Sequence, residues 1–183
     1  TVTLHVTLEE QPPAPLPITL FLALPRPNMI ARLLRDVTSL GIKNIHLFHS
    51  EKVEKSFWQT PTLFPETIRD KLTEGLSQAR DTVLPQVHTH QKYRAMLDTA
   101  LPATLATHTG ILADPYSPQA VLPAQFEQPL ALMIGPEGGF TDKERDDFLQ
   151  LGCKPLWLGS RILRVETAVL TAIGNLGTRV HLP

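Results

Sequence analysis

The chain has 183 residues, with 17 Lys and Arg against 18 Asp and Glu and a formal net charge of −1. This length suits one domain, or two small ones, with a core large enough to be stable. A single cysteine, Cys153, excludes an intramolecular disulfide framework and a cysteine-cluster metal site, and it favours a cytoplasmic setting. The longest apolar run, residues 18–24 with one threonine, is too short to cross a membrane. Near-neutral charge gives no general field for nucleic acid.

The pattern of the first ten residues predicts the end of an upstream domain. Residues 2–8 alternate apolar and polar side chains, which predicts a half-buried strand. Residues 11–17 contain four prolines and predict a linker, because proline can neither continue a helix nor donate to a sheet. Since the chain begins with Thr1 rather than Met, we expect residues 1–10 to close an upstream domain that is absent here.

Strands and helices then alternate. Residues 18–24 predict a strand buried on both faces. A helix follows, with Asn28 as its expected N-cap, four apolar residues on one face and Gly41 at its end. Residues 42–48 predict a second strand.

The rest of the chain continues this alternation. The further predicted elements are a helix from Pro65, a short strand at Val87, a helix over 93–101, strands over 109–113, 130–134 and 154–158, and helices over 141–151 and 166–180. Thr141 and Glu144 have the spacing of a capping box at the start of one of these helices. The order predicts an α/β fold with a mostly parallel sheet covered on both faces.

Two loops follow predicted strands, where ligands of parallel sheets bind. The first, residues 134–141, reads Ile-Gly-Pro-Glu-Gly-Gly-Phe-Thr. Its glycines allow the backbone to approach a ligand closely, although a tight strand-to-helix turn would need them as well. The spacing fits neither a dinucleotide fingerprint nor a P-loop. The loop therefore predicts a ligand other than a cradled phosphate.

The second loop, residues 158–168, carries Arg161 and Arg164 ahead of a helix that begins near Glu166. Two arginines at a helix N-terminus can bind an anion. The alternative is structural, with Arg164 paired to Glu166. Two such loops at the ends of neighbouring strands favour a binding site.

These motifs carry a resemblance. Ile-Gly-Pro-Glu-Gly-Gly-Phe-Thr-x-x-Glu over 134–144, followed by Leu-Gly-x-Arg-Ile-Leu-Arg-x-Glu-Thr-Ala over 158–168, resembles the RsmE family. Members are S-adenosylmethionine-dependent methyltransferases of the SPOUT class, which act on N3 of a uridine in 16S ribosomal RNA. The resemblance implies a SPOUT domain over 18–183 with a C-terminal deep trefoil knot. It also implies that residues 1–10 end a missing PUA-like RNA-binding barrel.

The resemblance further implies a methyl-donor site made of backbone groups and apolar side chains. The residues we expect to hold S-adenosylmethionine are Leu112, Asp114, Ile134, Gly135, Gly138, Leu158, Gly159, Ser160, Ile162 and Leu163. For Asp114 the alternative is a solvated turn residue. No metal is expected, because His88 and His90 lack a third ligand.

Methylation at N3 requires loss of the N3 proton, which leaves negative charge on the uracil. Arg164 is the expected stabiliser of that charge. Glu137 or Glu166 could accept the proton, although either could instead orient an arginine or cap a loop, and the structural role is favoured for Glu166. The expected RNA contacts are Arg161, Lys52 and Arg80.

Lys52 and the Arg80-Asp81 pair depart from the family pattern, as does Ser39, so RNA contacts and substrate identity stay open. The expected partners are 16S rRNA or the small ribosomal subunit, and a second copy of the chain through the C-terminal helix. A competing hypothesis is a catalytically inactive knotted module that binds RNA or the ribosome.

Overall fold

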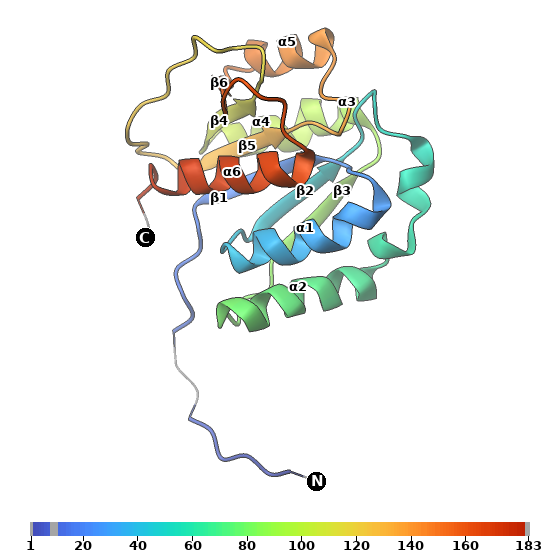
Figure 1. Cartoon of the computed structure of the whole chain (residues 1–183), viewed down its shortest axis with the longest axis vertical. Helices are drawn as coiled ribbons and strands as arrows, with labels where there is room; N and C mark the ends of the chain where they lie inside the picture. The colour runs from blue at the N-terminus through green and yellow to red at the C-terminus, as the bar shows by residue number, and fades with distance from the viewer. Residues whose placement is uncertain (1, 8–10, 182–183) are drawn as a thin grey trace.

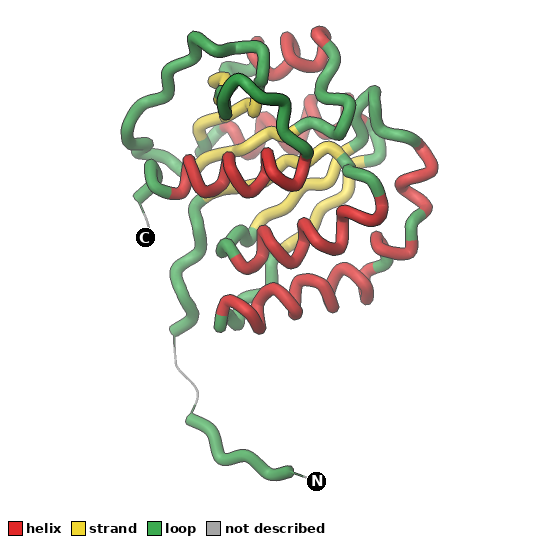
Figure 2. Tube along the Cα trace, in the orientation of Figure 1, coloured by secondary structure: helices red, strands yellow, loops and turns green. Residues whose placement is uncertain are grey.

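The structure, a computed structural model, describes residues 2–7 and 11–181. The strands in these ranges are β1 (Ile18–Ala23), β2 (Asn44–Phe48), β3 (Gln86–His90), β4 (Thr109–Ala113), β5 (Leu130–Ile134) and β6 (Lys154–Leu156). They form one sheet in the order β3-β2-β1-β5-β4-β6, and every pairing is parallel (Figures 1 and 2). The predicted α/β fold is confirmed.

The two central strands, β1 and β5, are buried at every position. They pair in parallel register, with Leu20 beside Leu132. Both are apolar runs without the alternation of a half-exposed strand, so helices must cover both faces of the sheet. The same packing holds the carboxyl ends of β5 and its neighbour β4 at one edge.

Helices cover the sheet in two layers (Figure 1). The longer ones are α1 (Pro27–Ser39), α2 (Pro65–Ala79), α5 (Asp142–Gln150) and α6 (Val165–Gly177). α1 and α6 lie on one face, and α2 packs outside α1 at Gly75, where a Cβ would come within 2.5 Å of the Arg35 carbonyl oxygen. On the other face, Phe148 of α5 meets Phe48 of β2 edge to face.

Shorter helical segments complete the fold. They are the 3₁₀ turns η1 (Lys55–Gln59) and η2 (Pro61–Leu63), α3 (Tyr93–Ala95), the π-helical turn η3 (Met96–Ala100) and α4 (Leu101–Leu105). The helix predicted over 93–101 therefore continues to Leu105 through a π-helical turn. Pro102 explains that turn, because it lacks the N–H that a regular α-helix would donate to residue 98.

One predicted cap is wrong. α1 begins at Pro27 with Arg26 as its N-cap, so Asn28 lies inside the helix. Proline suits this first position, because its fixed φ is helical and its missing N–H has no helical partner to lose. Gly41 does end the helix, with a φ of +85° that favours glycine.

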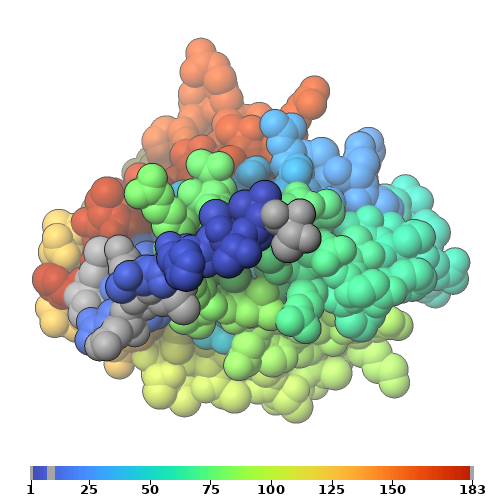
Figure 3. Space-filling model, turned by 90° about the horizontal axis from the view of Figure 1, so that it is seen from below, coloured from blue at the N-terminus to red at the C-terminus, as the bar shows by residue number. Residues whose placement is uncertain are grey.

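Residues 2–7 form no strand, and they extend away from the sheet (Figure 1). In the view from below they lie in front of the rest of the chain (Figure 3). The apolar side chains of Val2, Leu4 and Val6 are 69–84% exposed. A strand needs a neighbour to pair with, and in the described part of the chain this segment has none. Residue 8 of the predicted strand lies outside the described residues, as do 1, 9 and 10. The barrel assignment stays a prediction.

Residues 11–17 contain no helix or strand. Across residues 2–7 and 11–181, none of the helices is long and apolar enough to pass through a membrane.

Candidate functional site

A pocket opens at the carboxyl edge of the sheet, between the loops that follow β4, β5 and β6. Its volume is about 870 Å³ with the open mouth and the solvent in it included. Residues 113–116, 134–140 and 158–163 supply most of its wall, although Ser160 does not contribute. The structure thus brings the two predicted loops together and adds a third.

Most of the predicted donor-binding residues line this pocket. They are Asp114, Ile134, Gly135, Gly138, Leu158, Gly159, Ile162 and Leu163, and Glu137 and Arg161 line it as well. Leu112 does not, because it is fully buried in the core of the sheet. Ser160 is exposed and also lies outside the wall.

The first loop is tight and firmly anchored. A Cβ on Gly135 would lie 3.2 Å from the Phe140 nitrogen, so only glycine fits easily at that point. The ring of Phe140 stacks with that of Phe48 and packs against Phe148 at centroid distances of 6.2 and 5.0 Å. The glycines therefore serve both interpretations, because they allow the tight strand-to-helix turn and that turn also forms the pocket wall.

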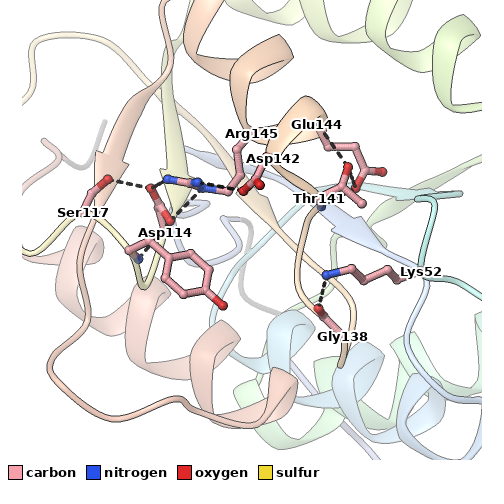
Figure 4. Close-up of polar contacts among 9 residues, drawn as sticks. Lys52, Asp114, Ser117, Gly138, Thr141, Asp142, Glu144 and Arg145 are labelled. Carbon is pink, nitrogen blue, oxygen red and sulfur yellow. Dashed lines mark hydrogen bonds and ion pairs between the residues drawn. The ribbon is translucent and has the colours of Figure 1, made fainter.

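Two predicted functional residues support this loop. The Glu137 carboxylate accepts a hydrogen bond of 3.0 Å from the Arg26 N–H at the start of α1. Lys52 donates to the carbonyl oxygen of Gly138 at 2.8 Å (Figure 4). Glu137 thus has the contact expected of a loop cap, and the Lys52 ammonium binds the loop backbone.

A buried carboxylate fixes the end of the same loop. Glu144 is only 3% exposed and forms the predicted capping box with Thr141, accepting from its N–H at 2.9 Å (Figure 4). Its other oxygen accepts from the Glu51 N–H at 2.9 Å. The capping box therefore also joins the loop after β2 to the pocket.

The second loop presents unpaired cations. Arg161 and Arg164 are exposed, and neither forms an ion pair with another described residue. The alternative pairing of Arg164 with Glu166 is therefore not seen. Arg164 is the N-cap of α6 and Glu166 lies in its first turn, and both lie just outside the pocket wall.

Asp114 and Arg145 form an ion pair with two hydrogen bonds at the pocket. Asp114 is 2% exposed, so the alternative of a solvated turn residue is wrong. Arg145, on α5, lines the pocket and binds both carboxylate oxygens of Asp114. Sequence reasoning missed Arg145, because its partner is 31 residues away and no local pattern marks the pair.

Other candidate residues lie elsewhere. Arg80 is the C-cap of α2, at the amino edge of the sheet opposite the pocket. Trp58 is half-buried, and its indole N–H donates to the Nδ1 of His49 at 3.1 Å, which anchors its loop. Burial raises the pKa of Cys153 to about 12, which makes it unreactive. Among the described residues no group of side chains could hold a metal ion.

Comparison with known proteins identifies the family. The RNA methyltransferase domain model matches residues 12–177. A ribosomal RNA small subunit methyltransferase E from Treponema pallidum is 31% identical over 191 residues, which cover 98% of this chain and 69% of that protein. The chain belongs to this family. The Synechocystis member is also 31% identical, over 96% of this chain and 58% of that protein.

A solved structure of the family agrees. The Neisseria gonorrhoeae ribosomal RNA small subunit methyltransferase E, bound to S-adenosyl methionine, superposes with a TM-score of 0.74 at 25% identity. The match covers 94% of this chain and 69% of that one. The chain thus spans about 58–69% of these three relatives. Membership supports the SPOUT assignment, and the knot stays a prediction.

Proposed function

We propose that this family member transfers a methyl group from S-adenosylmethionine to N3 of a uridine in 16S ribosomal RNA, either free or in the small subunit. The observation that carries the proposal is the pocket in which both family motifs meet. The names of the relatives support an RNA substrate, and the Neisseria relative binds the methyl donor itself.

The pocket fits a sulfonium nucleoside. Ile134, Leu158 and Leu163 offer apolar contacts, and the glycines beside them present backbone donors and acceptors. Gly159 has a φ of +118°, and a Cβ there would meet no atom within 4 Å. A side chain at this point of the wall would therefore take up open space next to the pocket. When bound, S-adenosylmethionine supplies an electrophilic methyl group on a positively charged sulfur.

The residues of the chain must then stabilise a deprotonated base. The N3 of uracil becomes nucleophilic once its proton leaves, and negative charge spreads onto the flanking carbonyl oxygens. Arg164 is our candidate stabiliser, because it is an exposed, unpaired cation of the described chain at the N-terminus of α6. The helix dipole adds to its positive charge. Such preorganised groups typically contribute about 10²–10³ in rate.

Two carboxylates are candidates for the proton acceptor. Glu137 lines the pocket, but one of its oxygens is held by the Arg26 N–H. Its second oxygen has no partner among the described residues. Glu166 is half-buried in the first turn of α6, which favours a structural role at the helix start. Glu137 is therefore the candidate that the contacts favour.

RNA binding and dimerisation complete the proposal. Arg161 at the pocket is the RNA contact that the geometry supports best, since Lys52 binds Gly138 and Arg80 lies at the opposite edge of the sheet. We also propose a homodimer through α6, where Leu170 is exposed and a Cβ on Gly174 would meet nothing within 4 Å. Action on ribosomal RNA would place the protein in the cytoplasm.

The test combines binding with methyl transfer. Calorimetry measures S-adenosylmethionine affinity, and mass spectrometry maps methylated uridine in 16S rRNA or small subunits from cells that lack the modification. Arg164→Ala should lower turnover about 10²–10³-fold, with donor affinity within a few-fold of the unchanged protein. Arg69→Ala is the control, because Arg69 is exposed on α2 and forms no ion pair with another described residue. RNA binding without methyl transfer by the unchanged protein would support the inactive module instead.

A further inference from the structure

Arg145 contacts the loop that follows β4 through a two-pronged ion pair with Asp114. Its Nε lies 3.1 Å from Oδ1 of Asp114, and its Nη2 lies 2.9 Å from Oδ2 (Figure 4). The Asp114 side chain is 0% exposed and that of Arg145 is 20% exposed. Such forked pairs fix geometry as well as charge. Arg145 thereby ties α5 to the turn that follows β4.

The Asp114 carboxylate organises this turn. It also accepts from the Tyr116 N–H at 3.0 Å and from the Ser117 hydroxyl at 2.6 Å. With the two bonds from Arg145, each oxygen has two donors, so Asp114 has no acceptor site left for a ligand. Burial alone would raise the pKa of Asp114, but the bonds from Arg145 and Ser117 outweigh it and lower that pKa. Asp114 therefore acts within the turn as a fixed anion.

The turn presents an aromatic ring to the pocket. Tyr116 lines the pocket wall and is 67% exposed. The guanidinium carbon of Arg145 lies 5.3 Å from the centre of its ring, within cation–π distance. Arg145 therefore holds the turn at two points, at the Asp114 carboxylate and at the Tyr116 ring.

We propose that Arg145 is a positioning residue that fixes the 114–117 turn, and that the Tyr116 ring forms part of the wall that S-adenosylmethionine contacts. The inference rests on the proposed function. When the pocket wall is ordered before binding, the entropy cost of ordering it is not part of the binding free energy, and affinity is higher. Only arginine suits this position, because the lysine ammonium offers neither a planar fork nor a flat face for stacking.

The experiment compares four variants: Arg145→Lys, Arg145→Gln, Tyr116→Ala and the control Arg35→Lys. Arg35 pairs with Glu74 between α1 and α2, away from the pocket, and both side chains are less than half exposed. We expect Arg145→Lys to weaken S-adenosylmethionine binding about tenfold or more, the size of one lost charge-assisted bond. Tyr116→Ala should also weaken it, because the ring is lost from the pocket wall. Arg145→Gln should weaken it further, and Arg35→Lys should leave it within twofold.

A purely structural role for Arg145 would lower the melting temperature and leave donor affinity of the folded protein unchanged. The inference would be overturned if Arg145→Lys and Tyr116→Ala both bound S-adenosylmethionine with an affinity within twofold of that of the unchanged protein. Should Arg145→Lys not fold, Tyr116→Ala decides alone, since its exposed ring is not needed for folding.

A second readout is independent of the methyl donor. In the unbound protein, amide exchange at Asp114, Tyr116 and Ser117 should be faster in Arg145→Lys and unaltered in Arg35→Lys. Equal exchange in both variants would overturn the positioning role. If the unchanged protein fails to bind S-adenosylmethionine, the proposed function fails, and the exchange measurement still decides whether Arg145 fixes the turn.

Discussion

Glu144→Ala should destabilise the protein far more than removal of an ordinary surface glutamate. The side chain is 3% exposed and accepts from the Glu51 N–H, the Thr141 N–H and the Thr141 hydroxyl. The substitution removes a helix cap, which typically contributes about 1 kcal/mol to stability. It also removes hydrogen bonds to a charged group, which contribute about 1.5–3 kcal/mol. The contributions overlap, so we expect a loss of about 2–4 kcal/mol.

Thermal and urea unfolding measure this loss, which corresponds to a fall in melting temperature of roughly 5–15 °C for a domain of this size. Glu66→Ala is the matched control, because Glu66 also lies in the first turn of a helix, α2, but is exposed. It should cost about 0.5 kcal/mol or less. Glu144→Gln keeps one acceptor oxygen and should fall between the two. A loss below about 1 kcal/mol in Glu144→Ala would refute the reasoning.

Two further predictions follow from backbone strain and from burial. Gly159 and Gly152 have positive φ values of +118° and +84°, and a Cβ at either would have no atom within 4 Å. Alanine at either position should therefore lower stability by about 1–2 kcal/mol through backbone strain. Calorimetry should show weaker S-adenosylmethionine binding only for Gly159→Ala, and equal affinities of the two variants would contradict the pocket assignment. Burial, and then the nearby His88 and His90, lowers the pKa of His46 from 6.5 to about 4. Below pH 6.5 the unfolded chain therefore binds a proton at His46 that the folded protein does not bind. The stability of the fold then falls as the pH drops towards 4. This loss of stability should reach about 1 kcal/mol by pH 5 after allowance for solvent screening. His46→Phe should shrink the difference in urea midpoint between pH 7.5 and pH 5. An unaltered difference would contradict the role of His46 in this pH dependence.

Local sequence signals predicted most of the fold. The apolar runs of β1 and β5, the positive φ at Gly41 and the capping box at Thr141 each follow from residues close together in the chain. These features decide where elements begin and end, so the alternation of strands and helices was correct. The missed cap at Asn28 is also local, since Pro27 takes the first helical position.

Contacts between distant residues could not be predicted in this way. Arg145 with Asp114, and Glu137 with the Arg26 N–H, join segments 31 and 111 residues apart. Neither pair leaves a trace in periodicity or spacing, because the sheet order alone brings them together. The motif residues of the pocket were found through the family resemblance, whereas the residues that hold them in place needed the structure.

The central claim is that the loops after β4, β5 and β6 together hold the methyl donor. A crystal structure of the chain with S-adenosylmethionine tests it most directly. The account predicts the donor between residues 113–116, 134–140 and 158–163, where the pocket lies. A donor bound elsewhere, or these loops closed by their own side chains with no donor between them, would contradict it.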